Sequence, residues 1–112
     1  FYADALGMAV VPPPGESGTT RGAYVCDGNG TQIVHLVAAS AVPDAPAPVR
    51  GKAQRGMVDH FALLCTDAPA FRHRLTACDV PFEAMVVPEI SAELIFVRDP
   101  NEVLVELHFR ID

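Results

Sequence analysis

The sequence lacks several features that would assign it to a particular class of protein. It contains no tryptophan, and aromatic residues make up only 7% of its 112 residues. No apolar run approaches the roughly 20 residues that a membrane-spanning helix needs, and no signal-peptide pattern is present. Basic residues are also scarce, since eight Lys and Arg stand against 14 Asp and Glu and leave a net charge of −6. This balance argues against nucleic acid or an anionic membrane as a partner.

Cysteines are few and show no pairing pattern. The three cysteines, Cys26, Cys65 and Cys78, are an odd number and form no CxxC pair. This usage is typical of reduced thiols that pack as small hydrophobic side chains, so we expect a cytoplasmic protein. The chain begins at Phe1 without an initiator Met, which indicates a fragment, a processed product or a sequence whose start is not shown.

The composition predicts one globular domain, residues 1–112. Half of the residues are hydrophobic and a fifth are charged, and the chain is long enough to bury a core. The stretch "SAVPDAPAPVRGKAQRG", residues 40–56, contains three prolines and is predicted to be an extended linker. It separates a first module, residues 1–39, from a second module, residues 57–112.

The second module is predicted to be a strand, a helix and three further strands. These elements are, in order, residues 57–65, 66–79, 81–87, 91–99 and 103–109. Thr66 or Asp67 is suited to be the N-cap of the helix, which places Phe71, Leu75 and Cys78 on one apolar stripe.

The first module is predicted to have the same order without the leading strand. "FYADALG" is typical of the end of a helix, with Gly7 as its left-handed stop. "MAVV" is a short strand, and a hairpin follows around the turn residues 27–30.

An internal duplication explains this match. In the aligned turns, Asp27 stands on Asp99 and Asn29 on Asn101, and a slip of one residue in the turn then places His35 on Glu106. Chance matching of apolar strands is the alternative, but the shared order of elements favours a duplication. The counterpart of His60 would then lie in a strand upstream of Phe1.

The last predicted strand, "VLVELHF", carries a carboxylate among apolar residues. Side chains alternate across a strand, so one face carries Val103, Val105, Leu107 and Phe109, and the other carries Leu104, Glu106 and His108. An ionised Glu among apolar neighbours is costly unless something pairs with it. The partner is either a salt bridge or a metal ion.

His35 and His60 occupy comparable places in two other strands. Each has apolar neighbours on its own face, and each alone is more often a core or edge residue than a ligand. Together with Glu106 they form a set of two imidazoles and a carboxylate, which suits Zn, Ni, Mn or Fe(II). His73 falls off the apolar stripe of the helix and is predicted to be a solvated surface residue.

The chain resembles the vicinal oxygen chelate superfamily, which includes glyoxalase I, extradiol dioxygenases, fosfomycin resistance proteins and bleomycin resistance proteins. The resemblance spans essentially the whole chain and is carried by "FYADALGM", "QIVHLV", "VDHFALLCTD" and "LIFVRDPNEVLVELHF". It implies an α+β fold in which two βαβββ modules form a cupped, incomplete eight-stranded barrel around a metal. The first strand of the first module is missing from the chain as given.

The resemblance also implies residue roles. His35 matches the fourth-strand metal ligand of the first module, and His60 and Glu106 match the first-strand and fourth-strand ligands of the second. A further ligand would come from the strand before Phe1. Glu106 is in addition the candidate general base. His108 is the candidate substrate-binding residue, with a position at the rim of the site as the alternative.

The turn before the last strand departs from the family pattern. Glu102 stands where a glycine is usual in the family. We expect Asn101 to adopt the left-handed conformation in its place.

The function that the resemblance implies is a metal-dependent enzyme of the glyoxalase or dioxygenase type. It would bind a small oxygen-rich substrate through two oxygens to a divalent metal, for isomerisation, lyase or oxygenation chemistry. The alternative is a non-enzymatic drug-binding protein resembling bleomycin resistance proteins, although the low aromatic content argues against it. Family members often dimerise, and an exposed sheet edge invites pairing, so we expect a homodimer.

Overall fold

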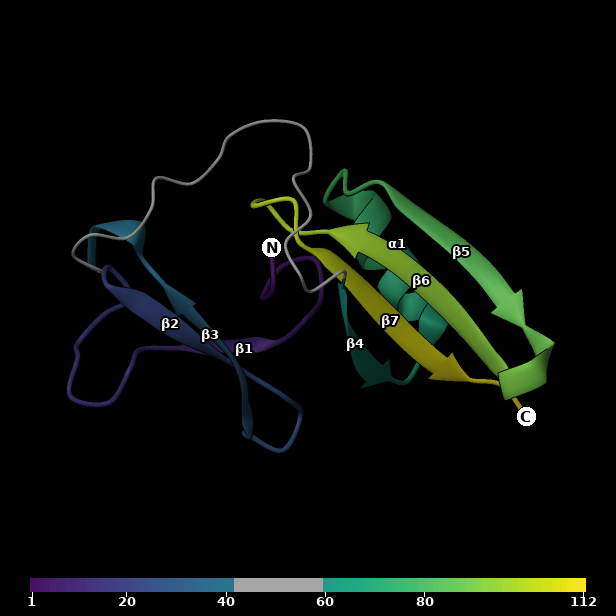
Figure 1. Ribbon diagram of the computed structural model, residues 1–112, viewed down its shortest axis with the longest axis horizontal. Helices are drawn as coiled ribbons and strands as arrows, with labels where there is room; N and C mark the ends of the chain where they lie inside the picture. The colour runs from purple at the N-terminus through teal and green to yellow at the C-terminus, as the bar shows by residue number, and fades with distance from the viewer. Residues whose placement is uncertain (42–59) are drawn as a thin grey trace. The chain divides into compact units, whose positions relative to one another are not determined.

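The chain divides into two compact units. The computed structural model describes residues 1–41 and 60–112 (Figure 1). One unit is built on residues 7–41, and the other on residues 60–112 with residues 3–6 of an N-terminal turn. Most of the predicted linker 40–56 lies outside the described residues. Each unit is described by itself below.

The unit built on residues 7–41 is a three-stranded antiparallel sheet in the order β1-β2-β3. Its elements are β1 (Ala9–Val11), β2 (Gly22–Cys26), β3 (Gln32–Val37) and the short 3-10 helix η1 (Ala39–Ala41). The predicted short strand and hairpin are therefore confirmed. The central strand β2 supplies the buried side chains of this sheet, because Ala23, Val25 and Cys26 are at most 6% exposed.

The predicted helix end at residues 1–7 is a single helical turn that ends at Gly7. The Ala5 N–H donates to the Phe1 carbonyl at 2.9 Å, which closes one helical turn. Gly7 then adopts a φ of 71°, the left-handed conformation expected of it. Burial of the Leu6 side chain, 1% exposed, helps to hold this turn in place.

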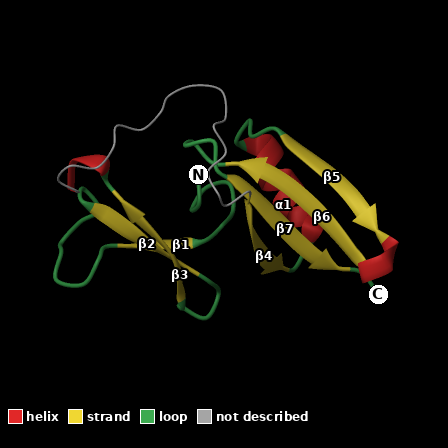
Figure 2. Cartoon of the chain, in the orientation of Figure 1, coloured by secondary structure: helices red, strands yellow, loops and turns green. Residues whose placement is uncertain are grey.

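The other unit has the predicted order of strand, helix and three strands. Its elements are β4 (His60–Cys65), α1 (Ala68–Ala77), β5 (Phe82–Val87), the 3-10 helix η2 (Pro88–Ile90), β6 (Ala92–Arg98) and β7 (Leu104–Arg110). The strands lie in the order β4-β7-β6-β5, with β4 parallel to β7 and the other pairs antiparallel. Figure 2 shows α1 lying along one face of this sheet. Neither of the two sheets closes on itself among the described residues.

Helix α1 begins at a side-chain cap and packs on the sheet. The Asp67 carboxylate accepts a hydrogen bond from the Ala70 N–H at 3.1 Å, as the capping prediction requires. Leu75 is fully buried, and the Phe71 ring meets the Phe109 ring edge-on at 5.3 Å. Cys78 was predicted to share this apolar stripe, but it is exposed because it lies past the last helical turn, at the C-cap.

The alternation of β7 sorts its side chains between the two faces of the sheet. Val105 and Leu107 are fully buried and Phe109 is 3% exposed on the face that α1 covers. Val103, predicted for the same face, is 42% exposed because it precedes the first residue of the strand. We call the opposite face, which points away from α1, the distal face; it carries Leu104, Glu106 and His108 on β7.

The turns of the two hairpins are built in the same way. Asp27 Oδ1 accepts the Asn29 and Thr31 N–H groups at 2.9 and 2.8 Å. Asp99 Oδ1 accepts the corresponding N–H groups two and four residues on, at 2.8 and 2.9 Å. The shared geometry supports the predicted duplication.

The left-handed residue of the second turn is Glu102. Its φ is 66°, and the equivalent Gly30 in the first turn has a φ of 78°. The prediction that Asn101 would take this conformation is wrong. The Asp99 side chain accepts a hydrogen bond from the Asn101 N–H, which holds Asn101 early in the turn. The chain therefore reverses at the next residue, Glu102, which takes the left-handed conformation.

The predicted slip of one residue is a β-bulge. Consecutive residues Val25 and Cys26 of β2 pair with Val34 and Gln32 of β3, which leaves Ile33 as the extra residue. Beyond the bulge Tyr24 pairs with His35, and in the other hairpin Phe96 pairs with Glu106. His35 and Glu106 are therefore equivalent positions of the two hairpins, as the alignment predicts.

Candidate functional site

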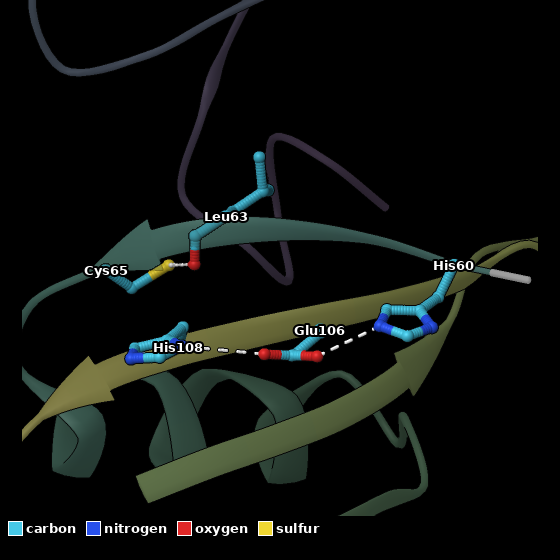
Figure 3. A network of polar contacts seen from close by, with 5 residues as sticks. All are labelled: His60, Leu63, Cys65, Glu106 and His108. Carbon is cyan, nitrogen blue, oxygen red and sulfur yellow. Dashed lines mark hydrogen bonds and ion pairs between the residues drawn. The ribbon is translucent and has the colours of Figure 1, made fainter. Parts of the chain in front are cut away.

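His60 and Glu106 meet on the distal face. In the parallel pair of β4 and β7, Ala62 stands directly opposite Glu106, and His60 lies two residues earlier on the same face. The two side chains lean toward each other, and His60 Nε2 lies 3.0 Å from Glu106 Oε2 (Figure 3). The contact is a hydrogen bond when Nε2 carries a proton, and an ion pair when the whole ring is protonated.

His108 approaches the other oxygen of the same carboxylate. Its Nδ1 atom lies 3.5 Å from Glu106 Oε1. The two residues are two positions apart on β7, so both side chains stand on the distal face (Figure 3). Glu106 thus lies between two imidazoles, and its side chain is only 14% exposed, against 36% for His60 and 28% for His108.

Apolar side chains of β6 border this group. Phe96 stands opposite Glu106, and Leu94 stands opposite His108. The Phe96 ring meets the His60 ring edge-on at 6.2 Å between centroids. Sequence reasoning did not single out Phe96. The signal was available, because counting strand pairs back across the turn at residues 99–102 places Phe96 across from Glu106.

Cys65 stands opposite Phe109, on the face that α1 covers, and its thiol is not part of the polar group on the distal face. Its Sγ atom contacts the Leu63 carbonyl oxygen at 3.3 Å (Figure 3). Burial raises the pKa of the Cys65 thiol from 9.0 to about 11, although the His108 backbone N–H and the charge of Arg74 act in the opposite direction. The thiol is therefore protonated at neutral pH and is neither a ready nucleophile nor a ready metal ligand.

His35 belongs to the unit built on residues 7–41. It is exposed on β3, where it pairs in register with Tyr24. The two rings stack with 4.5 Å between centroids and an angle of 31° between planes. Of the four predicted site residues, His60, Glu106 and His108 lie together in one sheet, and His35 lies in the other.

The residue types at this site fit two positions of a metal centre. An imidazole nitrogen and a carboxylate oxygen, both accepted by borderline divalent metals, converge from His60 and Glu106 on neighbouring strands. Among residues 1–41 and 60–112, no group of three or more His, Cys, Asp or Glu side chains is arranged to hold a metal ion. A complete centre needs a donor from outside this pair.

Comparisons with known proteins establish the fold. No protein-family model matches the chain, and no curated protein matches it. Among solved structures, a protein from Bacillus anthracis described as a glyoxalase family member has a TM-score of 0.67 at 22% identity, over 98% of this chain and 79% of that one. Lactoylglutathione lyase from Agrobacterium tumefaciens has a TM-score of 0.60 at 19% identity, over 97% of this chain and 80% of the lyase.

A fosfomycin resistance protein from Listeria monocytogenes is also similar. Its TM-score is 0.63 at 13% identity, over 97% of this chain and 78% of that one. Taken with the strand order and the two similar hairpins, these likenesses show that the chain has the fold of the vicinal oxygen chelate superfamily.

In the part of this chain that the structure describes, no helix is long and apolar enough to cross a membrane.

Proposed function

We propose that the chain is a metal-dependent enzyme of the glyoxalase or dioxygenase type, which binds a small oxygen-rich substrate through two of its oxygen atoms. The observation that carries the proposal is the 3.0 Å contact between His60 Nε2 and Glu106 Oε2. It joins two kinds of metal donor on one face of a sheet. The likeness to a lyase and to a fosfomycin resistance protein supports the same class of chemistry.

In this proposal the ligands are those that the resemblance implies, His35, His60 and Glu106, and the ion is Zn, Ni, Mn or Fe(II). When bound, the ion supplies Lewis-acid stabilisation of negative charge on the substrate oxygens, or, as Fe(II), the means to activate O₂. The equivalence of His35 and Glu106 in the two hairpins supports assigning both to one kind of role.

The residues around the carboxylate are suited to handle a proton. Glu106 takes the substrate proton at a carboxylate oxygen, as a general base does. The low exposure of its side chain, 14%, keeps competing water away from that oxygen. His108, 3.5 Å from Oε1, stands beside the proton acceptor and binds the polar end of the substrate.

Metal content and metal affinity test the proposal. We expect purified full-length protein to carry a divalent metal by elemental analysis, and to bind Zn²⁺ in calorimetric titration after removal of the metal. His60→Ala and Glu106→Gln should each weaken binding by more than about tenfold, because each removes a donor. His73→Ala is the matched control, since His73 is exposed on α1 and away from the distal face.

A protein that binds none of Zn²⁺, Ni²⁺, Mn²⁺ or Fe²⁺ would overturn the proposal. So would His60→Ala and Glu106→Gln variants that bind metal as tightly as His73→Ala does.

A second candidate is a non-enzymatic drug-binding protein. Leu64 and Met85 are 68% and 50% exposed, and the strand pairing places both on the distal face with Glu106. An apolar ligand could lie on these side chains without any metal. Binding of bleomycin that persists in EDTA and in His60→Ala would favour this function over the first.

We also propose that the chain forms a homodimer. Among the described residues, the edge strands β1, β3, β4 and β5 each pair on one side only. Such an edge strand presents N–H and C=O groups that another strand can use. Sedimentation equilibrium of the full-length protein at micromolar concentration should give twice the chain mass, and a monomer there would contradict the proposal.

A further inference from the structure

The Tyr24 and His35 rings stack at a tilt across β2 and β3. They are directly paired in register, and their ring centroids lie 4.5 Å apart with 31° between the planes. Within the described part of the chain, the His35 ring makes no hydrogen bond or ion pair, so this stack is the contact that restricts it. An exposed histidine without such a neighbour would rotate freely among its rotamers.

The second hairpin provides a natural comparison. Phe96 occupies the position equivalent to Tyr24, since it pairs with Glu106 as Tyr24 pairs with His35. Each hairpin therefore sets an aromatic ring across from a candidate metal ligand. The two rings differ in one group, the hydroxyl of Tyr24.

The Tyr24 hydroxyl is not needed for the stack. Ring contacts depend on the aromatic face and edge, and Phe96 makes such a contact with His60 without a hydroxyl. Tyr24 is half-buried, and among the described residues nothing forms a hydrogen bond with its hydroxyl. A polar group of this kind, fixed beside a candidate ligand, is available to a bound molecule.

We propose that Tyr24 serves the His35 part of the site in two ways. Its ring positions the His35 imidazole, and its hydroxyl donates a hydrogen bond to an oxygen atom of the molecule that binds beside His35. The role of the ring rests on the stack alone. The role of the hydroxyl rests on the proposed function, because it requires an oxygen-rich ligand at His35.

The role of the ring is tested in metal-free, full-length protein by the NMR signal of the His35 Cε1–H group. Tyr24→Phe should leave this signal in place, because the stack remains. Tyr24→Leu should move it toward the position of an unstructured histidine. Phe96→Leu is the matched control, which should shift the His60 signal and spare that of His35.

Tyr24→Ile, which keeps a strand-forming side chain, replaces Tyr24→Leu if the latter fails to fold. A His35 signal that stays unchanged in the folded aliphatic variant overturns the positioning role.

The role of the hydroxyl is tested with acetohydroxamate, a small probe that chelates through two oxygens. We expect the Zn²⁺-loaded wild type to bind the probe, and Tyr24→Phe to bind it about fivefold more weakly, the effect of one lost hydrogen bond. Zn²⁺ affinity of Tyr24→Phe should equal that of wild type.

Equal probe affinity of the two proteins overturns the role of the hydroxyl alone. Failure of the Zn²⁺-loaded wild type to bind the probe counts against the proposed function and removes the role of the hydroxyl with it. The NMR result decides the role of the ring in either case.

Discussion

Glu106 and His60 meet across two parallel strands, with 3.0 Å between Oε2 and Nε2. The strand register sets this contact, since the two residues are offset by two positions and share one face. A carboxylate in an apolar strand needs a partner, and the partner of Glu106 here is the His60 imidazole. The same two side chains are also metal donors. Their arrangement is therefore compatible with a salt bridge in metal-free protein and with part of a metal centre.

The first prediction concerns the coupling of this pair in metal-free protein. A double-mutant cycle of His60→Ala and Glu106→Gln should give a coupling free energy of about 0.2–1 kcal/mol near pH 6, because the His60 side chain is partly exposed. Urea unfolding measures it. Saturating Zn²⁺ should raise the urea midpoint of the wild type and not that of the double variant. A coupling indistinguishable from zero would show that the contact contributes nothing in solution.

The second prediction concerns the two faces of β7. Leu107→Ala should lower the free energy of unfolding by about 2–5 kcal/mol, because it opens a space in a fully buried layer. Val103→Ala should change it by less than about 0.5 kcal/mol, since that side chain is largely exposed and precedes the strand. Thermal and urea unfolding compare the two directly. Similar losses in both variants would mean that the assignment of faces is wrong.

The third prediction concerns the left-handed position of each turn. Glu102→Gly should stabilise the protein by about 0.5–1 kcal/mol, because glycine adopts a positive φ without the steric cost that a side chain brings. Gly30→Ala at the equivalent position of the other turn should be destabilising by a comparable amount. Chemical denaturation of the pair tests both. Opposite signs are expected, and two changes of the same sign would refute the shared turn geometry.

The fourth prediction concerns thiol reactivity. At pH 8 iodoacetamide should label the exposed Cys78 quickly and Cys65 slowly, because burial raises the pKa of Cys65 to about 11 and keeps it protonated. Mass spectrometry of time points gives both rates. Rapid labelling of Cys65 in folded protein would contradict its burial.

The raised pKa of Cys65 also has a consequence for stability. The folded state holds this proton more tightly than the unfolded chain, whose thiol has a pKa near 9.0. The contribution of this thiol to the stability of the folded state is therefore fully present below pH 9 and is lost as the pH rises toward about 11. Cys65→Ala should remove that part of the alkaline decline, measured as the urea midpoint between pH 8 and pH 11. If Cys65→Ala loses stability at alkaline pH as much as the wild type does, the loss comes from other groups.

Local patterns in the sequence determined most of the second sheet. The alternation in "VLVELHF", the capping residue Asp67 and the turn residue Asp99 act within a few positions of one another. Periodicity, side-chain capping and turn hydrogen bonds are short-range, so they can be recognised without knowledge of the fold. The equivalence of His35 and Glu106 was likewise accessible, because the bulge leaves a gap of one residue in the alignment of the hairpins.

The sequence was a poorer guide where local preferences are nearly balanced. In the second turn Glu102, and not Asn101, takes the left-handed conformation. Cys78 belongs to the cap of α1 and not to its apolar stripe. In each case a neighbouring hydrogen bond or the position of a helix end decided between alternatives of similar energy.

Only the tertiary structure decided which side chains of the site meet. His60 and Glu106 are 46 residues apart in the chain, and their contact exists because β4 pairs in parallel with β7. Phe96 enters the site for the same reason, through the register of β6 on β7. Sequence alternation can assign a side chain to a face of a strand. The choice of neighbouring strand and its register depends on burying the opposite face under α1, which is a property of the whole sheet.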